Sequence, residues 1–120
     1  MSAIKKHTIS FKYALNGIIY TFTTQPNFKI HVLAAIIAIG ASFILNVTQA
    51  EKIVIVFTIS LVLMAEMINT AIESMIDLLT DKFHKQAKIA KDVSAGMVLL
   101  SAISSLFIAY IIFGKYLINT

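Results

Sequence analysis

Three long stretches of this chain carry no formally charged side chain, and they constrain its fold more than any other feature. The stretches are residues 30–47, 53–65 and 93–114. The helical pattern of the second stretch continues to residue 79. A helix crosses the apolar core of a bilayer with about 20 mostly apolar residues, each adding about 1.5 Å. The sequence therefore predicts three transmembrane helices, which we place at residues 28–47, 52–79 and 91–115.

The composition agrees with a membrane protein. Of the 120 residues, 58% are hydrophobic and only 13% are charged, whereas about a quarter of the residues in an ordinary soluble domain are charged. Three spans use most of the length, so we expect residues 1–120 to form a single membrane-embedded domain with any active site at the membrane. The chain has no cysteine, which excludes disulfides, thiolate metal sites and a cysteine nucleophile.

The lysines predict the partners and the orientation of the chain. All ten basic residues are lysines in short segments beside the apolar stretches, so we expect anionic headgroups or nucleotide phosphates as partners and no nucleic acid. Eight of them flank the N-terminal segment and residues 80–91, which we expect to form a basic loop, while Lys52 and Lys115 lie at the opposite ends of the spans. By the positive-inside rule, the loop faces the cytoplasm.

The N-terminal segment, residues 5–24, predicts an amphipathic helix that lies on the membrane surface. Its apolar residues recur at helical spacing, and they are Phe11, Leu15, Ile18 and Phe22. We expect Pro26 to end this helix and residues 25–27 to form a short turn. A soluble helix packed on a partner is the alternative interpretation.

Four polar residues of the second span fall on one helical face. They are Glu66, Asn69, Glu73 and Asp77, and on an ideal helix they cover an arc of roughly 80°. If Lys52 marks the outer boundary of the membrane, Glu66 lies about 21 Å along the helix, inside the hydrocarbon region. A carboxylate at that depth is costly, so it marks a functional site or has a specific partner. A structural ion pair with a lysine or an oligomer contact is the alternative.

The spacing of the two glutamates suits a division of labour. Glu66 would meet a lipid hydroxyl and accept its proton, and Glu73, near the inner boundary, would hold Mg²⁺ against the phosphates of a soluble nucleotide. Phosphoryl transfer needs little beyond such positioning and charge neutralisation. Lys91 and Asp92 would add a cation for phosphate and a further acidic group. The chain has neither a G-x-x-x-x-G-K-[ST] nor a G-x-G-x-x-G motif, which excludes the familiar soluble kinase folds.

These residues together resemble the signature of the bacterial diacylglycerol kinase/undecaprenol kinase family. The matching segments are Glu66 to Glu73, then Asp77, His84 and residues 87–92, with residues 27–31 before the first span. The resemblance implies an all-α membrane protein with an N-terminal amphipathic surface helix plus three transmembrane helices. It also implies a homotrimeric helical bundle with active sites shared between subunits, in the bacterial plasma (inner) membrane, and with the active site on the cytoplasmic side.

The resemblance also implies roles for individual residues. Glu66 falls on the catalytic base that contacts the lipid substrate, Asn69 lies beside it in the site, and Glu73 falls on the Mg²⁺-binding glutamate. The expected ATP-binding residues are Tyr13, Glu73, Lys82, Phe83, His84, Lys91 and Asp92. Many relatives carry a second metal-binding glutamate where this chain has Gln25, which offers a carbonyl oxygen without charge, and Asp77 is a residue that would compensate.

The sequence therefore predicts an ATP- and Mg²⁺-dependent lipid kinase that phosphorylates the hydroxyl of diacylglycerol to give phosphatidic acid. Undecaprenol is the alternative acceptor, because both lipids present a hydroxyl at the membrane interface and the same base serves either. Two further alternatives remain, a non-enzymatic transporter or channel subunit and a family member that has lost activity and kept a structural role. Intramembrane carboxylates also suit a transporter, but that alternative gives no reason for His84, Lys91 and Asp92 at the same membrane face.

Overall fold

A computed structural model describes residues 2–118, apart from the side chains of residues 7–9. The chain forms four helices, α1 (Ala3–Thr24), α2 (Pro26–Ile44), α3 (Gln49–Leu79) and α4 (Lys85–Ile118), and the described residues contain no strand. Three of the helices, α2, α3 and α4, are long and apolar enough to cross a membrane. The prediction of an all-α membrane protein with an N-terminal helix and three spans is confirmed.

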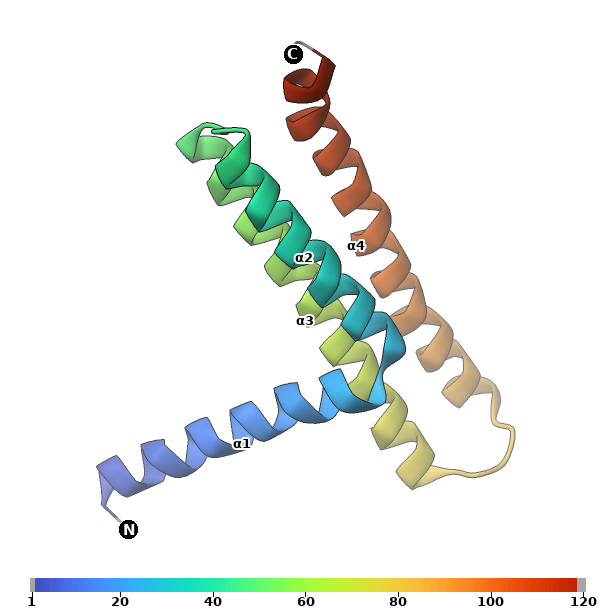
Figure 1. The fold of residues 1–120 in the computed structure, drawn as a ribbon. Helices are drawn as coiled ribbons and strands as arrows, with labels where there is room; N and C mark the ends of the chain where they lie inside the picture. The colour runs from blue at the N-terminus through green and yellow to red at the C-terminus, as the bar shows by residue number, and fades with distance from the viewer. Residues whose placement is uncertain (1, 119–120) are drawn as a thin grey trace.

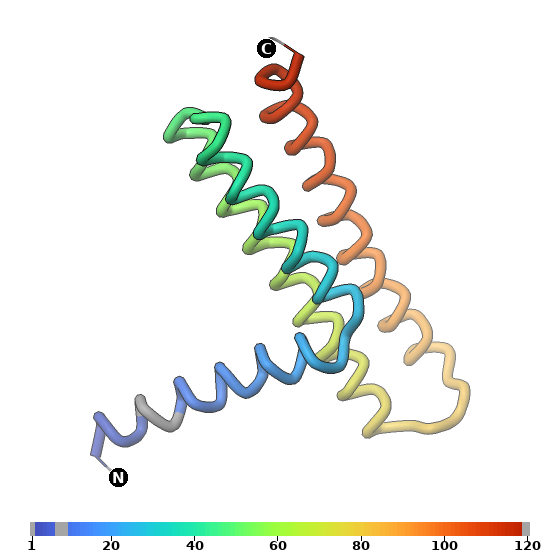
Figure 2. The backbone as a smooth tube through the Cα atoms, in the orientation of Figure 1, coloured from blue at the N-terminus to red at the C-terminus, as the bar shows by residue number. Residues whose placement is uncertain are grey.

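The three spanning helices run side by side, and α1 leaves them at a steep angle (Figure 1). Helix α3 packs against both α2 and α4. The path of the backbone is also visible in Figure 2, where the N-terminal end of α1 lies far from the other helices. The apolar side chains of α1, such as Phe11 and Leu15, are exposed. An exposed helix with an apolar face is suited to lie in a membrane interface.

The turn between α1 and α2 is shorter than residues 25–27, which is a correction to the sequence prediction. Gln25 alone separates the two helices, with an extended backbone, and Pro26 is already the first residue of α2. Proline is tolerated there because the first N–H groups of a helix have no intrahelical acceptor. A proline that ends one helix can therefore begin the next.

The first span ends earlier than residue 47. Helix α2 stops at Ile44, and Asn46 has a φ of 52°, a left-handed conformation that asparagine adopts more readily than most residues. Helix α3 then starts with a capping box. The Thr48 hydroxyl accepts a hydrogen bond from the Glu51 N–H, and the Glu51 carboxylate accepts one from the Thr48 N–H.

The prediction of a basic loop over residues 80–91 is wrong beyond residue 84, because α4 begins at Lys85. The first turn is held by two bonds to His84, whose carbonyl accepts from the Lys88 N–H and whose Nδ1 accepts from the Gln86 N–H. Lys88 and Asp92, four residues apart, form an ion pair on the exposed side of this turn. Charged residues outside the apolar core thus continue the helix instead of ending it.

Candidate active site

The buried polar face of α3 is the centre of the candidate site. Glu66 is only 2% exposed, and Asn69 one turn later is 9% exposed. Oε2 of Glu66 has no hydrogen-bond partner among the described residues. The next residue on this side, Thr70, donates its hydroxyl to the Glu66 backbone carbonyl at 2.9 Å and so leaves the carboxylate free. A buried carboxylate with an unused oxygen can accept a proton or a hydrogen bond from a ligand.

Asn69 connects this face to Glu73, one turn further along α3, and to α4. Its amide Nδ2 donates to Oε1 of Glu73 at 3.2 Å. Its amide oxygen accepts a hydrogen bond of 2.6 Å from the hydroxyl of Ser94, which lies near the start of α4 and is 2% exposed. A continuous chain of hydrogen bonds therefore runs from α4 through Asn69 to the Glu73 carboxylate.

Two ion pairs involve the predicted charged residues at the start of α4. Nζ of Lys91 lies 2.8 Å from Oδ1 of Asp77, so this pair joins the last turns of α3 to α4. Asp92 is paired with Lys88 on its own helix. Lys91 also interacts electrostatically with Glu73. The structure thus brings Lys91 to the acidic face of α3, whereas Asp92 is exposed and turned to a different partner.

The remaining predicted nucleotide and metal residues lie outside α3 and outside the start of α4. Lys82, Phe83 and His84 lie in the exposed loop between α3 and α4. Tyr13 is 67% exposed on α1, the helix that leaves the bundle (Figure 1). Gln25 is half-buried at the junction of α1 and α2, and its side chain forms no cap hydrogen bond with α2.

Glu73 is the described carboxylate that best suits a divalent cation. One of its oxygens accepts the hydrogen bond from Asn69, and no described residue donates to the other. Mg²⁺ is usually held by only one or two protein carboxylates, with phosphate oxygens and waters completing its ligands. Among the side chains that the structure describes, no group of three His, Cys, Asp or Glu residues could hold a metal ion.

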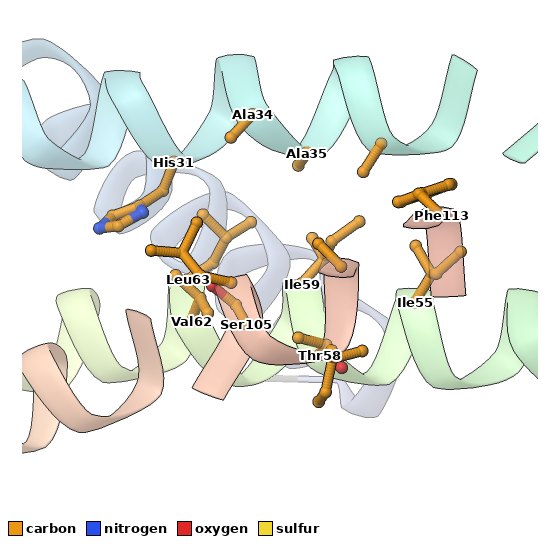
Figure 3. Close-up of a pocket in the computed structure, with 14 residues that line it drawn as sticks. His31, Ala34, Ala35, Ile55, Thr58, Ile59, Val62, Leu63, Ser105 and Phe113 are labelled. Carbon is orange, nitrogen blue, oxygen red and sulfur yellow. The ribbon is translucent and has the colours of Figure 1, made fainter. Parts of the chain in front are cut away.

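An apolar cavity of about 140 Å³ lies between α2, α3 and α4. Figure 3 shows His31 at one end of it, close to Val62 and Leu63. Val62 lies at the His31 end of the cavity (Figure 3), and Glu66 is one turn further along α3. Apolar side chains thus line most of the cavity, and the His31 imidazole lies at the end nearest Glu66.

Sequence reasoning omitted two residues from the candidate site. His31 carried a usable signal, because a titratable side chain at the start of an otherwise uncharged span is uncommon. Ser94 carried none, because serine is frequent in membrane helices and its neighbour Asn69 is 25 residues away in the chain. Only the packing of α3 on α4 reveals that contact.

Comparison with known proteins identifies the family. The family model described as prokaryotic diacylglycerol kinase matches residues 12–113. A diacylglycerol kinase of Synechocystis sp. is 42% identical over 101 residues, which are 83% of this chain and 58% of that protein. An undecaprenol kinase of Bacillus subtilis is 39% identical over 104 residues, which are 87% of this chain and 85% of that protein. A diacylglycerol kinase of Escherichia coli (strain K12) is 24% identical over 91 residues, which are 76% of this chain and 75% of that protein.

The match covers nearly all of the helical part of the chain, although the chain spans little more than half the length of the Synechocystis relative. The matched residues include the whole polar face of α3 and the start of α4, where the hydrogen bonds and ion pairs described above lie. The chain belongs to the prokaryotic diacylglycerol kinase family, a family of lipid kinases that transfer phosphate to an alcohol.

Proposed function

We propose that this protein is an ATP- and Mg²⁺-dependent kinase that phosphorylates the hydroxyl of diacylglycerol to give phosphatidic acid. The observation that carries the proposal is the order of groups along one face of α3. A buried carboxylate with an unused oxygen, Glu66, is followed towards the helix end by Asn69 and the half-buried Glu73. A lipid hydroxyl and a soluble triphosphate can meet along such a face.

Glu66 is the general base of this mechanism. It accepts the proton of the acceptor hydroxyl while the hydroxyl oxygen attacks the γ-phosphorus of ATP. The bond between that phosphorus and the bridging oxygen of ADP breaks, so the products are the lipid phosphate and ADP. Burial excludes water from Glu66 and so limits transfer of the phosphoryl group to water.

Glu73 and Lys91 hold the nucleotide in this proposal. Glu73 would ligate Mg²⁺, which neutralises phosphate charge when it is bound, and the Asn69 amide fixes one oxygen of that carboxylate. Lys91 would exchange its contact with Asp77 for one with a phosphate oxygen. The exposed ion pair is weak enough for such an exchange. Asp77 thus keeps the ammonium group near the site before ATP binds.

Two further parts of the proposal concern the assembly and its orientation. The concentration of lysines around α1 and the α3–α4 loop supports a site on the cytoplasmic side of the bacterial plasma membrane, where ATP is available. Tyr13 is exposed on α1, the helix that leaves the bundle (Figure 1), which supports a homotrimer whose active sites combine residues of neighbouring subunits.

The function is tested by replacing the proposed base. Purified protein in mixed micelles should transfer the γ-phosphate of ATP to diacylglycerol only when Mg²⁺ is present. Glu66→Gln keeps the size and burial of the side chain but removes the base, so we expect turnover to fall by at least about 100-fold. Asp81→Asn, in the exposed loop, is the matched control and should retain activity. A fully active Glu66→Gln protein would refute the mechanism.

The acceptor is tested by a side-by-side assay of diacylglycerol and undecaprenol. Proteins named for each acceptor are similar to this chain, so undecaprenol is the second candidate. We expect kcat/KM to favour diacylglycerol by more than about tenfold, which corresponds to about 1.4 kcal/mol of transition-state discrimination. A preference of this size for undecaprenol would reassign the acceptor and leave the role of Glu66 intact.

A further inference from the structure

Ser94 is a buried residue to which the resemblance assigns no role, yet it contacts the centre of the candidate site. We propose that Ser94 is a positioning residue that orients the Asn69 side-chain amide towards Glu73 and so fixes the carboxylate that receives the nucleotide's metal ion. The inference rests on the proposed function, because it assigns Ser94 to the same site.

The hydrogen bonds around Asn69 have one consistent direction. An ionised carboxylate only accepts hydrogen bonds, so the side of Asn69 that faces Glu73 must be its NH₂ group. The amide oxygen then faces the other way and needs a donor. The Ser94 hydroxyl supplies that donor at 2.6 Å. A group that only accepts hydrogen bonds in this place would favour the opposite orientation of the amide, with its oxygen repelled by Glu73.

Burial makes this contact consequential. Ser94 is 2% exposed and Asn69 is 9% exposed, so water cannot readily replace the hydroxyl when it is removed. The other acceptor within reach of the Ser94 hydroxyl is the Lys91 carbonyl of its own helix, at the longer distance of 3.1 Å. Without Ser94, the amide oxygen of Asn69 is left without its donor, and the amide is free to rotate away from Glu73.

Other serines on α4 provide a comparison within the same helix. Ser101 and Ser105 donate their hydroxyls to carbonyls of α4 itself, at 2.8 and 2.7 Å. Both are half-buried and neither contacts a polar side chain of α3 in any described hydrogen bond. Ser94 alone among these three joins the two helices through side chains. Ser101→Ala is therefore the matched control for Ser94→Ala.

The first test separates the hydroxyl from packing by using two pairs of side chains. The first pair is the unmodified protein and Ser94→Ala, which lacks the hydroxyl. The second pair is Ser94→Thr and Ser94→Val, whose side chains have nearly the same shape but of which only threonine carries a hydroxyl. We expect the two variants without a hydroxyl to need about fivefold more Mg²⁺ for half-maximal activity than their hydroxyl partners. The KM for the lipid should not change, and Ser101→Ala should behave as the unmodified protein.

The second test does not depend on turnover. In metal-free, ¹⁵N-labelled protein, the side-chain NH₂ resonances of Asn69 are assigned by their loss in Asn69→Asp. We expect Ser94→Ala and Ser94→Val to shift these resonances and speed their hydrogen exchange, while Ser94→Thr and Ser101→Ala leave them in place. The affinity for Mn²⁺ in the presence of ADP, measured by electron paramagnetic resonance, should fall in the same two variants.

A double variant tests whether Ser94 changes the Mg²⁺ requirement by acting through Asn69. If Ser94 acts through Asn69, adding Ser94→Ala to Asn69→Ala should change the Mg²⁺ requirement little further, whereas independent effects would multiply. Unchanged Asn69 resonances in Ser94→Ala, or equal effects of Ser94→Val and Ser94→Thr, would overturn the inference. An unmodified protein without kinase activity would overturn the proposed function instead, and the resonances and Mn²⁺ affinity would then decide the role of Ser94.

Discussion

Glu66 and Glu73 are the same residue type on the same helix, and their surroundings give them different chemistry. Glu66 is buried with an unused oxygen, so it suits a group that exchanges a proton with a ligand. Glu73 is half-buried, and one of its oxygens is fixed by Asn69, so it suits a group that holds a cation. Seven residues separate them, which is about two helical turns or 10 Å of axial rise.

A prediction at the residue scale concerns Gln25, which the family resemblance predicts to occupy the position of a metal-binding glutamate. Gln25→Glu adds a charged oxygen ligand, so we expect the Mg²⁺ concentration for half-maximal activity to fall by about tenfold. The measurement is a Mg²⁺ titration of turnover at fixed ATP. Gln25→Ala is the control and should not lower the Mg²⁺ requirement. An unchanged requirement in Gln25→Glu would place this side chain away from the metal.

At the scale of the helices, the two ends of the α3–α4 pair are held differently. At the end away from the candidate site, the Glu51 carboxylate accepts from Tyr116 at 2.6 Å and pairs with Lys115 at 2.8 Å. Buried Val47, Ile55 and Ile112 pack beside this cluster. At the site end, the joining contacts are the exposed pair of Lys91 and Asp77 and the buried hydrogen bond of Ser94. We call the cluster of Glu51, Lys115 and Tyr116 the clasp, because it joins α3 to α4 away from the candidate site.

Glu51→Gln tests this clasp. The change removes the charge that pairs with Lys115 and weakens the capping box of α3, so we expect the thermal midpoint in detergent to fall by a few degrees. Turnover well below that midpoint should remain unchanged because Glu51 lies at the opposite end of α3 from Glu73. Tyr116→Phe removes one hydrogen bond and should have a smaller effect. Loss of activity without loss of stability would contradict a purely structural role.

At the scale of the whole molecule, the chain has a small core and a large apolar exterior. The described core cluster comprises only a few residues at the far end of the bundle, while large apolar side chains such as Leu106 and Phe107 face outward. Lipid covers such surfaces, and in membrane proteins close helix packing between subunits covers them too. Helix α1 extends away from its own bundle (Figure 1), an arrangement that agrees with the proposed homotrimer.

Mixing two inactive variants tests whether the sites are shared. Tyr13→Ala removes a predicted nucleotide contact on α1, and Glu66→Gln removes the predicted base on α3. If one site takes these residues from different subunits, mixed oligomers contain some sites in which both native residues are present. We therefore expect activity to reappear when the two variants are unfolded together and reassembled. A mixture no more active than its separate components would show that each chain builds its own site.

The sequence by itself determined the helices and the polar face of α3, because both follow from local periodicity and from the length needed to cross a bilayer. Spacing alone was enough to align Glu66, Asn69 and Glu73. The sequence prediction was wrong at the ends of helices, as at Lys85 and Ile44. Capping and ion pairs decide where a helix begins and ends, and hydropathy does not.

Only the tertiary structure decided which helices meet at the site and which side chains lie between them. The contact of Ser94 with Asn69, the pairing of Lys91 with Asp77 and the position of His31 near Glu66 all depend on how one helix is rotated and shifted against another. In an apolar solvent that rotation is set by close packing and interhelical hydrogen bonds, because lipid covers the apolar faces of these helices as well as a neighbouring helix does.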